Sequence, residues 1–233
     1  MTLFRDSERQ RETGSPATYG EERLLGIPPP LQQARRLALI AESVLFASIL
    51  ICTLVLHSDK VNTYGISYFG IRLVTLPIIA TGFVLGGALL VSSSKRLPNF
   101  TQPWKLIKIT LRCVGVGIVL LLLTPYTVDT FFNWTHMTIG AAIFATQMYA
   151  GAVIVFKYQK DNVTTFALLI EFIGGILAMF SLPDNMLNLM LEGELIFQIG
   201  FMMILNRILR LSYEIGNTPA MEIDSQISGD GTN

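Results

Sequence analysis

Residues 68–91 read YFGIRLVTLPIIATGFVLGGALLV, an apolar run in which Arg72 is the only charged residue. A helix rises ~1.5 Å per residue, so about 20 apolar residues are needed to cross the ~30 Å hydrocarbon core of a membrane. The membrane interior admits only helices and closed barrels, because every backbone polar group there needs a partner within the protein. The run shows no sustained alternation of apolar and polar residues, so we predict a transmembrane helix.

The composition of the whole chain agrees with this prediction. Of its 233 residues, 51% are hydrophobic and only 15% are charged, and the mean hydropathy is +0.51. A soluble domain has about 25% charged residues, so the composition argues against a soluble globular protein. The 17 Lys and Arg residues balance 17 Asp and Glu residues. This zero net charge provides no basic field for nucleic acid, and we expect no nucleic-acid partner.

Six segments are long and apolar enough to be transmembrane helices, and short polar connections separate them. They cover approximately residues 37–57, 68–91, 106–125, 137–156, 164–181 and 187–209. We therefore predict an all-α, polytopic membrane protein whose single six-helix transmembrane bundle occupies residues 35–212. Residues 1–34, which contain the stiff Pro28-Pro29-Pro30 run, and residues 213–233 are polar and are expected to be disordered cytosolic tails.

The start of the last segment follows from its length. A helix from Glu194 to Arg207 would rise only ~20 Å, which is too short to cross a membrane. We therefore expect this helix to begin near Met186 or Leu187, after a turn at Pro183-Asp184-Asn185.

Basic residues fall in alternate connections between the six segments, and the positive-inside rule assigns such connections to the cytoplasm. These residues are Arg35, Arg36, Lys95, Arg96, Lys105, Lys108, Lys157, Lys160, Arg207 and Arg210. The other connections carry Lys60 and the acids Asp59, Asp129 and Asp184. We expect both termini in the cytoplasm, in a protein of the cell membrane or an endomembrane.

Two carboxyl groups fall within predicted spans, where an ionisable group is a functional candidate because it costs about 2.5–3.5 kcal/mol to insert. Glu171 lies near the middle of the fifth span and could bind a proton or another cation, or could fix helix packing. Glu42, in the first span, is a second proton or ion candidate, and it could instead pair with Arg35 or Arg36.

Polar residues near the outer ends of the spans form a candidate ligand-binding set. The set comprises Arg72, Asp129, Asn133, His136, Gln147, Glu192, Glu194 and Gln198. Arg72 needs a lipid phosphate or a carboxylate, for which Asp129, Glu192 and Glu194 are the available partners. Helical periodicity puts His136 and Gln147 on one face, and it stacks Glu194 on Gln198. If the outer loops fold inward, these residues line a polar cavity open to the outside.

Catalytic chemistry has fewer indications. Asp129, His136 and Glu194 are candidates for acid or base roles, whereas His136 alone could simply be an interfacial histidine in water. Ser67 and Thr135 are the nearby hydroxyl groups, and neither lies in a G-x-S-x-G nucleophile elbow. Two histidines without a metal-binding motif predict no metal site, and no cofactor motif is present. Cys52 and Cys113 are interpreted as small buried hydrophobes.

Two features of residues 68–91 concern packing. Gly82 and Gly86 form a G-x-x-x-G pattern, which permits close helix approach either within the chain or in a homodimer. Pro77 is expected to kink the helix, because its ring removes one backbone hydrogen bond.

Two short patterns, together with the six predicted spans over residues 36–212, resemble the FRAG/DRAM/SFK group of six-span membrane proteins and related multi-span families of unknown function. One is Ile66-Ser67-Tyr68-Phe69-Gly70, and the other is Asn133-x-x-His136 followed by Gly140-Ala141-x-x-Phe144. Members of that group are linked to the handling of lipids or lipid anchors. The resemblance therefore implies an amphiphilic ligand more readily than an ion.

Three functions remain open from the residues. The first is non-enzymatic binding of membrane lipids or another amphiphile through an outward-facing polar cavity. The second is a small proton-coupled transporter that uses Glu171. The third is a membrane-embedded enzyme that modifies a lipid. We rank them in this order.

Overall fold

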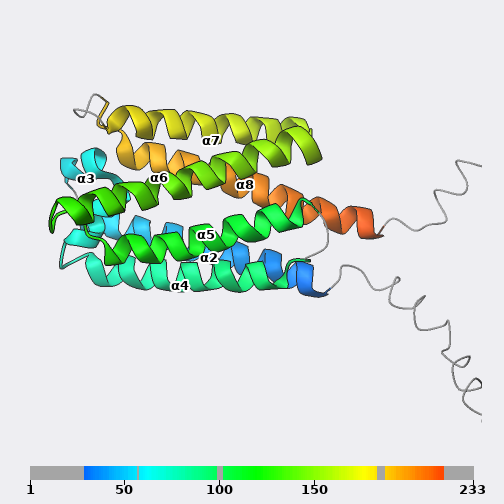
Figure 1. The fold of residues 1–233 in the computed structure, drawn as a ribbon, viewed down its shortest axis with the longest axis horizontal. Helices are drawn as coiled ribbons and strands as arrows, with labels where there is room; N and C mark the ends of the chain where they lie inside the picture. Colours follow the sequence, from blue (N-terminus) through cyan, green and yellow to red (C-terminus); the bar gives the residue numbers. More distant parts are fainter. Residues whose placement is uncertain (1–28, 57, 99–101, 183–186, 218–233) are drawn as a thin grey trace, which may run out of the picture. The chain divides into compact units, whose positions relative to one another are not determined.

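The computed structural model describes residues 29–56, 58–98, 102–182 and 187–217. These residues form helices and connections and contain no strand, so the predicted all-α class is confirmed for them (Figure 1). The helices are α2 (Pro29–Val55), α3 (Asp59–Tyr64), the 3₁₀ helix η1 (Gly65–Ile71), α4 (Leu76–Arg96), α5 (Trp104–Leu123), α6 (Thr130–Val153), the π-helical turn η2 (Ile154–Tyr158), α7 (Asn162–Ser181) and α8 (Met190–Asn217).

Five helices within the described ranges are long and apolar enough to cross a membrane. They cover Pro30–Val55, Leu76–Arg96, Trp104–Leu123, Thr130–Tyr158 and Asn162–Ser181. Large apolar side chains on their outer faces agree with lipid contact, since Leu54 is 75% exposed and Phe156 is 72% exposed. The chain therefore has the helices of a multi-pass membrane protein. Helix α8, which carries Glu194 near its start and Arg207 in its second half, is not one of these five.

The second predicted span is divided in the structure. Residues of its first part belong to η1, the chain turns after Arg72, and α4 begins at Leu76. The prediction that Pro77 kinks a helix is wrong, because Pro77 lies in the first turn of α4. A proline is tolerated there, since the first backbone N–H groups of a helix have no partner within it. As a result, Arg72 lies outside the helix that we predicted would contain it.

Several predicted boundaries move. Helix α2 begins at Pro29, so residues 29–34 are helical although we assigned them to the tail. Helix α8 begins at Met190, slightly after the expected start, and continues through residues 213–217. The turn expected at residues 183–185 lies outside the described residues, as do residues 1–28 and 218–233 of the predicted tails.

Small residues set the closest helix contacts. Gly82 and Gly86 are buried against Ser48 and Leu45 of α2, so the G-x-x-x-G pattern serves packing within the chain. Gly87 of α4 contacts the backbone of Gly115 in α5.

Helices α7 and α8 approach each other just as closely. Gly174 of α7 meets the backbone of Phe197, and Gly193 of α8 meets the backbone of Ala178. A Cβ atom at either glycine would collide with main-chain atoms, which cannot rotate away. Glycine is therefore required at both positions for this helix pair.

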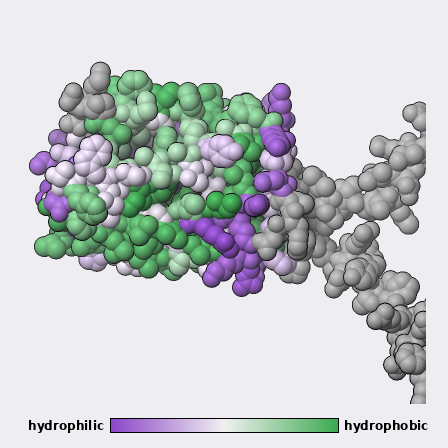
Figure 2. All heavy atoms as spheres, in the orientation of Figure 1, coloured by the Kyte–Doolittle hydropathy of each residue, from purple (hydrophilic) through white to green (hydrophobic). Residues whose placement is uncertain are grey.

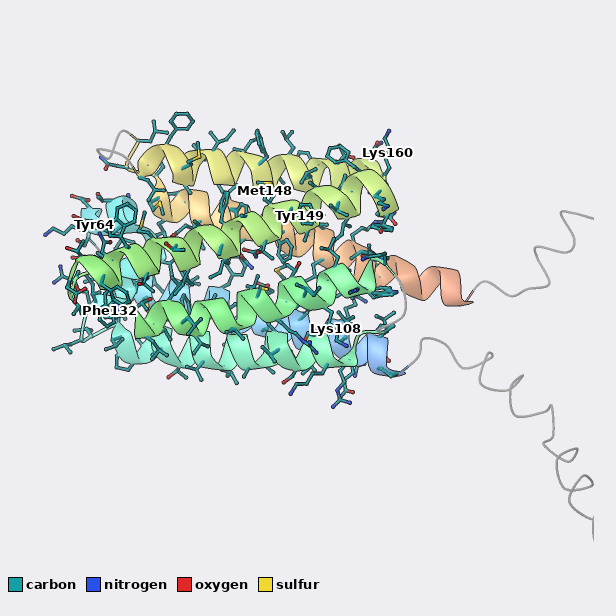
Figure 3. The ribbon with its side chains drawn as sticks, viewed as in Figure 1. Tyr64, Lys108, Phe132, Met148, Tyr149 and Lys160 are labelled. Carbon is teal, nitrogen blue, oxygen red and sulfur yellow. The ribbon has the colours of Figure 1, made fainter. Side chains whose placement is uncertain are left out.

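The connections are sorted between the two ends of the bundle formed by residues 29–210. Lys108 and Lys160 lie at one end, which we call the basic end, and Tyr64 and Phe132 lie at the other, which we call the tyrosine end (Figure 3). On the face seen in Figure 2, hydrophilic residues gather mainly toward the basic end, and apolar surface covers most of the remainder. This distribution is the one expected of a bundle that crosses a membrane.

Polar contacts attach α8 to its neighbours at the basic end. The Arg207 Nε lies 3.1 Å from Oδ2 of Asp161, which caps α7. The Arg35 Nε of α2 donates to Oδ1 of Asn206 at 3.0 Å. The charged second half of α8 is therefore held by partners on two other helices.

Candidate functional site

Two adjoining cavities lie inside the bundle, toward the tyrosine end. The main cavity has a volume of about 170 Å³ and is walled chiefly by apolar side chains of α2, α4, α5, α6 and α8. The polar groups on its wall belong to Ser67, Gln147, Glu194 and Gln198. A minor cavity of about 20 Å³ is lined in part by Tyr126 and His136, and it shares Ser67 with the main cavity. An apolar pocket with a few convergent polar groups is the usual form of a ligand site.

Glu194 is positioned by the unusual start of η1. Its Oε2 accepts a hydrogen bond from the backbone N–H of Ile66 at 2.7 Å. The preceding residue, Gly65, has φ of 64°, in the left-handed region that favours glycine. A Cβ atom at Gly65 would also collide with the Glu194 carboxylate. Glycine at this position therefore lets α8 dock its carboxylate against η1.

A buried polar chain crosses the bundle beside the main cavity. The Gln198 Nε2 of α8 donates to both carboxylate oxygens of Glu42, at 3.1 and 3.0 Å, and the Gln147 Nε2 of α6 donates to the Gln198 Oε1 at 3.0 Å. Glu42 is 1% exposed. Its partner is the Gln198 amide of α8, and Arg35, one of the two arginines that we considered, binds Asn206 instead.

Glu171 is placed differently from the other acids. It is 0% exposed, lies against Gly151 of α6 and Gly200 of α8, and does not line either cavity. Within the described part of the chain, neither of its carboxylate oxygens has a hydrogen-bond partner. A buried polar atom without a partner is costly, and native proteins contain few of them. The structure thus leaves the carboxyl group of Glu171 without a structural partner.

His136 is held on both sides of its ring. Its Nδ1 lies 2.7 Å from the backbone oxygen of Thr124, and its Nε2 lies 2.8 Å from the Ser67 Oγ. A carbonyl oxygen can only accept, so we assign the proton to Nδ1, and in the neutral ring Nε2 then accepts from the Ser67 hydroxyl. His136 is 8% exposed, so the alternative of an interfacial histidine in water is wrong.

An aromatic cluster at the tyrosine end includes Tyr126, which lines the minor cavity. The rings of Tyr64 and Tyr68 stack with centroids 5.9 Å apart, and those of Tyr64 and Tyr126 do the same. Burial raises the pKa of Tyr126 to about 12, with a further increase from Tyr64 and Tyr68 that Arg72 partly opposes. Among the residues that the structure describes, the buried Tyr126 hydroxyl has no hydrogen-bond partner.

The eight residues of the predicted ligand set separate into two groups. Gln147, Glu194 and Gln198 meet at the main cavity, and His136 borders the minor cavity. The other four line neither cavity; they are Arg72, Asp129, Asn133 and Glu192.

Two of those four residues have other partners. The Arg72 guanidinium lies 4.6 Å from the centre of the Tyr68 ring and donates to its hydroxyl, and not to any of the three carboxylates named as possible partners beside a lipid phosphate. Asp129 caps α6 by accepting from the Phe132 N–H at 2.8 Å. Its side chain therefore has a structural role at the start of that helix.

Metal-binding and redox residues add little to the site. Within the ranges that the structure describes, no three His, Cys, Asp or Glu side chains gather as a metal ion would require. Cys52 is buried as expected. Cys113 is exposed on the outer face of α5, so its interpretation as a buried hydrophobe is wrong.

Comparison with protein-family models finds no match for this chain, and comparisons with curated proteins and with solved structures find none either. Its function must be inferred from the site geometry described above.

Proposed function

We propose that this protein is a multi-pass membrane protein that binds a lipid or another amphiphile in the main cavity. The observation that carries the proposal is the combination of an apolar wall with four polar groups, Ser67, Gln147, Glu194 and Gln198, in one cavity of about 170 Å³. Apolar cavities of about 150 Å³ hold a molecule the size of benzene. The cavity therefore suits the end of an acyl chain or a small amphiphile, with its polar group near Ser67 and Glu194.

The proposal includes six membrane crossings, with α8 as the sixth and with both termini in the cytoplasm of a cell membrane or endomembrane protein. Two observations support it. Two polar residues of α8 pair with other helices of the bundle, Gln198 with Glu42 of α2 and Arg207 with Asp161 at the start of α7. The basic connections also share one end of the bundle, which the positive-inside rule assigns to the cytoplasm.

Single cysteines test this topology. In a background with Cys52→Ser and Cys113→Ser, we would place one cysteine at Asp59 and another at Lys160, and treat sealed cells with a membrane-impermeant thiol reagent. For a protein of the cell membrane, labelling at position 59 alone is expected. Labelling at position 160 in sealed cells, or at both positions, would contradict the orientation.

A cavity-filling substitution tests amphiphile binding. A Cβ atom at Gly140, on the wall of the main cavity, meets no atom within 4 Å, so Gly140→Leu fills the cavity without a clash at its first atom. Ala141→Leu is the matched control, because Ala141 is the next residue of α6 and is exposed. Lipid retained through purification would be measured by mass spectrometry. We expect loss of a bound species in Gly140→Leu alone, and equal retention in both variants would refute the proposal.

The partnerless carboxyl group of Glu171 favours a second candidate function, proton or cation coupling. A buried ionisable group with no structural partner is the kind of residue that carries protons in transporters. The test is proton uptake into proteoliposomes under a pH gradient, comparing wild type with Glu171→Gln and with Asp59→Asn as a control, because Asp59 is exposed. Uptake lost only in Glu171→Gln supports coupling, and uptake retained in it rules out this role.

A further inference from the structure

Ser67 and His136 have the geometry of a nucleophile and its base. The Ser67 Oγ lies 2.8 Å from the His136 Nε2, within hydrogen-bond reach. The two residues come from separate elements, η1 and α6, which meet at the boundary between the two cavities. The pair therefore exists only in the folded bundle, next to the space in which a ligand would lie.

A third group orients the histidine. The backbone oxygen of Thr124, just after α5, lies 2.7 Å from Nδ1 and fixes the proton on that nitrogen. The lone pair of Nε2 then faces the Ser67 hydroxyl, which is the arrangement that activates a serine. In Ser-His-Asp enzymes a carboxylate accepts the hydrogen bond from Nδ1. Here a backbone carbonyl orients the histidine in the same way but carries no negative charge.

Ser67 is also accessible from the cavities. It is only half-buried, and it lines both the main and the minor cavity. Gly70, one turn further along η1 on the wall of the minor cavity, would carry a Cβ atom into open space. An acyl chain in the main cavity would bring its carbonyl carbon to Ser67, and the minor cavity of about 20 Å³ has room for a water molecule.

We infer that Ser67 and His136 form a nucleophile–base pair that hydrolyses an ester of the amphiphile in the main cavity. This inference rests on the proposed function, because the ester belongs to the amphiphile that the main cavity is proposed to bind. The Ser67 Oγ bonds to the ester carbonyl carbon while its proton passes to the His136 Nε2. The carbon–oxygen bond to the alcohol then breaks, and the alcohol oxygen takes the proton from Nε2. Water next attacks the acyl-Ser67 ester, His136 accepts the water proton and returns it to the Ser67 Oγ, and a free carboxylic acid leaves.

Fluorophosphonate probes test the pair in the full-length protein in detergent micelles. One probe carries a long alkyl chain and the other a short one, and peptide mass spectrometry locates the adduct. We expect an adduct on Ser67, which is lost in Ser67→Ala and forms about 100-fold more slowly in His136→Gln. Ser48→Ala is the control and should react as wild type does, because the Ser48 hydroxyl is buried and donates to the Leu45 carbonyl.

Absence of an adduct on Ser67 in the folded wild type would overturn the inference. An adduct that forms equally fast in His136→Gln would overturn the base role. If His136→Gln does not fold, Ser67→Cys in the background without Cys52 and Cys113 replaces it. A cysteine beside His136 is expected to react with iodoacetamide at least 10-fold faster than an isolated Cys113, and an equal or slower rate contradicts the inference.

The two probes also separate this inference from amphiphile binding. If both ideas hold, Gly140→Leu slows the long probe and leaves the short probe unchanged. If only the Ser67–His136 pair is correct, both probes label Ser67 and Gly140→Leu alters neither. If only amphiphile binding is correct, neither probe labels Ser67, while Gly140→Leu still loses the bound lipid.

Discussion

Gln198 donates to both carboxylate oxygens of Glu42, and it thereby ties α8 to α2 in the interior of the bundle. Its removal would leave a buried carboxyl group without this partner, at a cost of about 1–3 kcal/mol. We expect Gln198→Leu to lower the free energy of unfolding by that amount in a denaturant titration in detergent. Gln147→Leu, which removes one amide bond to Gln198, should cost about 1 kcal/mol. Equal losses in the two variants would show that Glu42 does not depend on Gln198.

Because η1 and α8 are in contact at Gly65, we expect substitution of this glycine to destabilise the protein. Gly65→Ala should destabilise the protein, because alanine disfavours the φ of 64° and its Cβ atom would displace the Glu194 carboxylate from Ile66. We expect a loss of about 1–3 kcal/mol in thermal unfolding. Gly70→Ala is the matched control in the same 3₁₀ helix and should have little effect, since its Cβ atom meets open space. Similar losses in both variants would contradict this explanation.

We expect the stabilising contribution of Asp161, at the basic end, to be lost in acid. Partial burial opposes its ionisation, but hydrogen bonds from the Thr164 backbone, Gln159 and Arg207 prevail and hold its pKa below the ordinary value. Its stabilising contribution is therefore complete above the ordinary aspartate pKa of ~3.9, and it is lost as the pH falls from there through the lower folded-state pKa.

Asp161→Ala should accordingly cost about 1 kcal/mol near pH 7, chiefly through loss of the cap on α7. The difference between wild type and variant should shrink as the pH falls below ~4. Thermal unfolding in detergent at a series of pH values provides the measurement. A difference that stays constant down to the lowest pH would contradict the depressed pKa.

We expect that the hydroxyl group of Tyr126 does not stabilise the fold. Its buried hydroxyl has no partner in the described part of the chain, whereas the Tyr68 hydroxyl accepts from Arg72. Tyr126→Phe should therefore unfold at the same temperature as wild type or slightly higher, and Tyr68→Phe should unfold lower. Ultraviolet titration of the wild type should show a contribution that ionises near pH 12 and is absent from Tyr126→Phe. Marked destabilisation by Tyr126→Phe would reveal a partner for this hydroxyl.

The membrane-helix character of the chain is predictable from its sequence because apolar length is a local property. The start of α4 was harder to predict from the sequence, since a proline such as Pro77 is compatible both with a kink inside a helix and with the first turn of a helix. Only the three-dimensional turn after Arg72 distinguishes the two. The same turn explains why Arg72 reaches Tyr68 and not a carboxylate.

The candidate site was predictable only in part. Helical spacing brought Gln147, Glu194 and Gln198 into consideration, and these residues meet at the main cavity. The partner of His136 was not predictable, because Ser67 lies in a separate 3₁₀ helix and carries no nucleophile motif. The role of the Thr124 backbone oxygen could not be predicted either, since every residue has a backbone carbonyl and the residue type does not show which one accepts from His136.

The glycine contacts between neighbouring helices restrict how an amphiphile can reach the main cavity. Backbones touch where Gly174 meets Phe197 and where Gly87 meets Gly115, so the α7–α8 and α4–α5 seams are closed to a hydrocarbon tail at those levels. A tail that arrives sideways from the bilayer must therefore pass between other helices or descend from the tyrosine end. The glycines at these two seams therefore determine where a lipid tail can enter the main cavity from the bilayer, although they do not line that cavity.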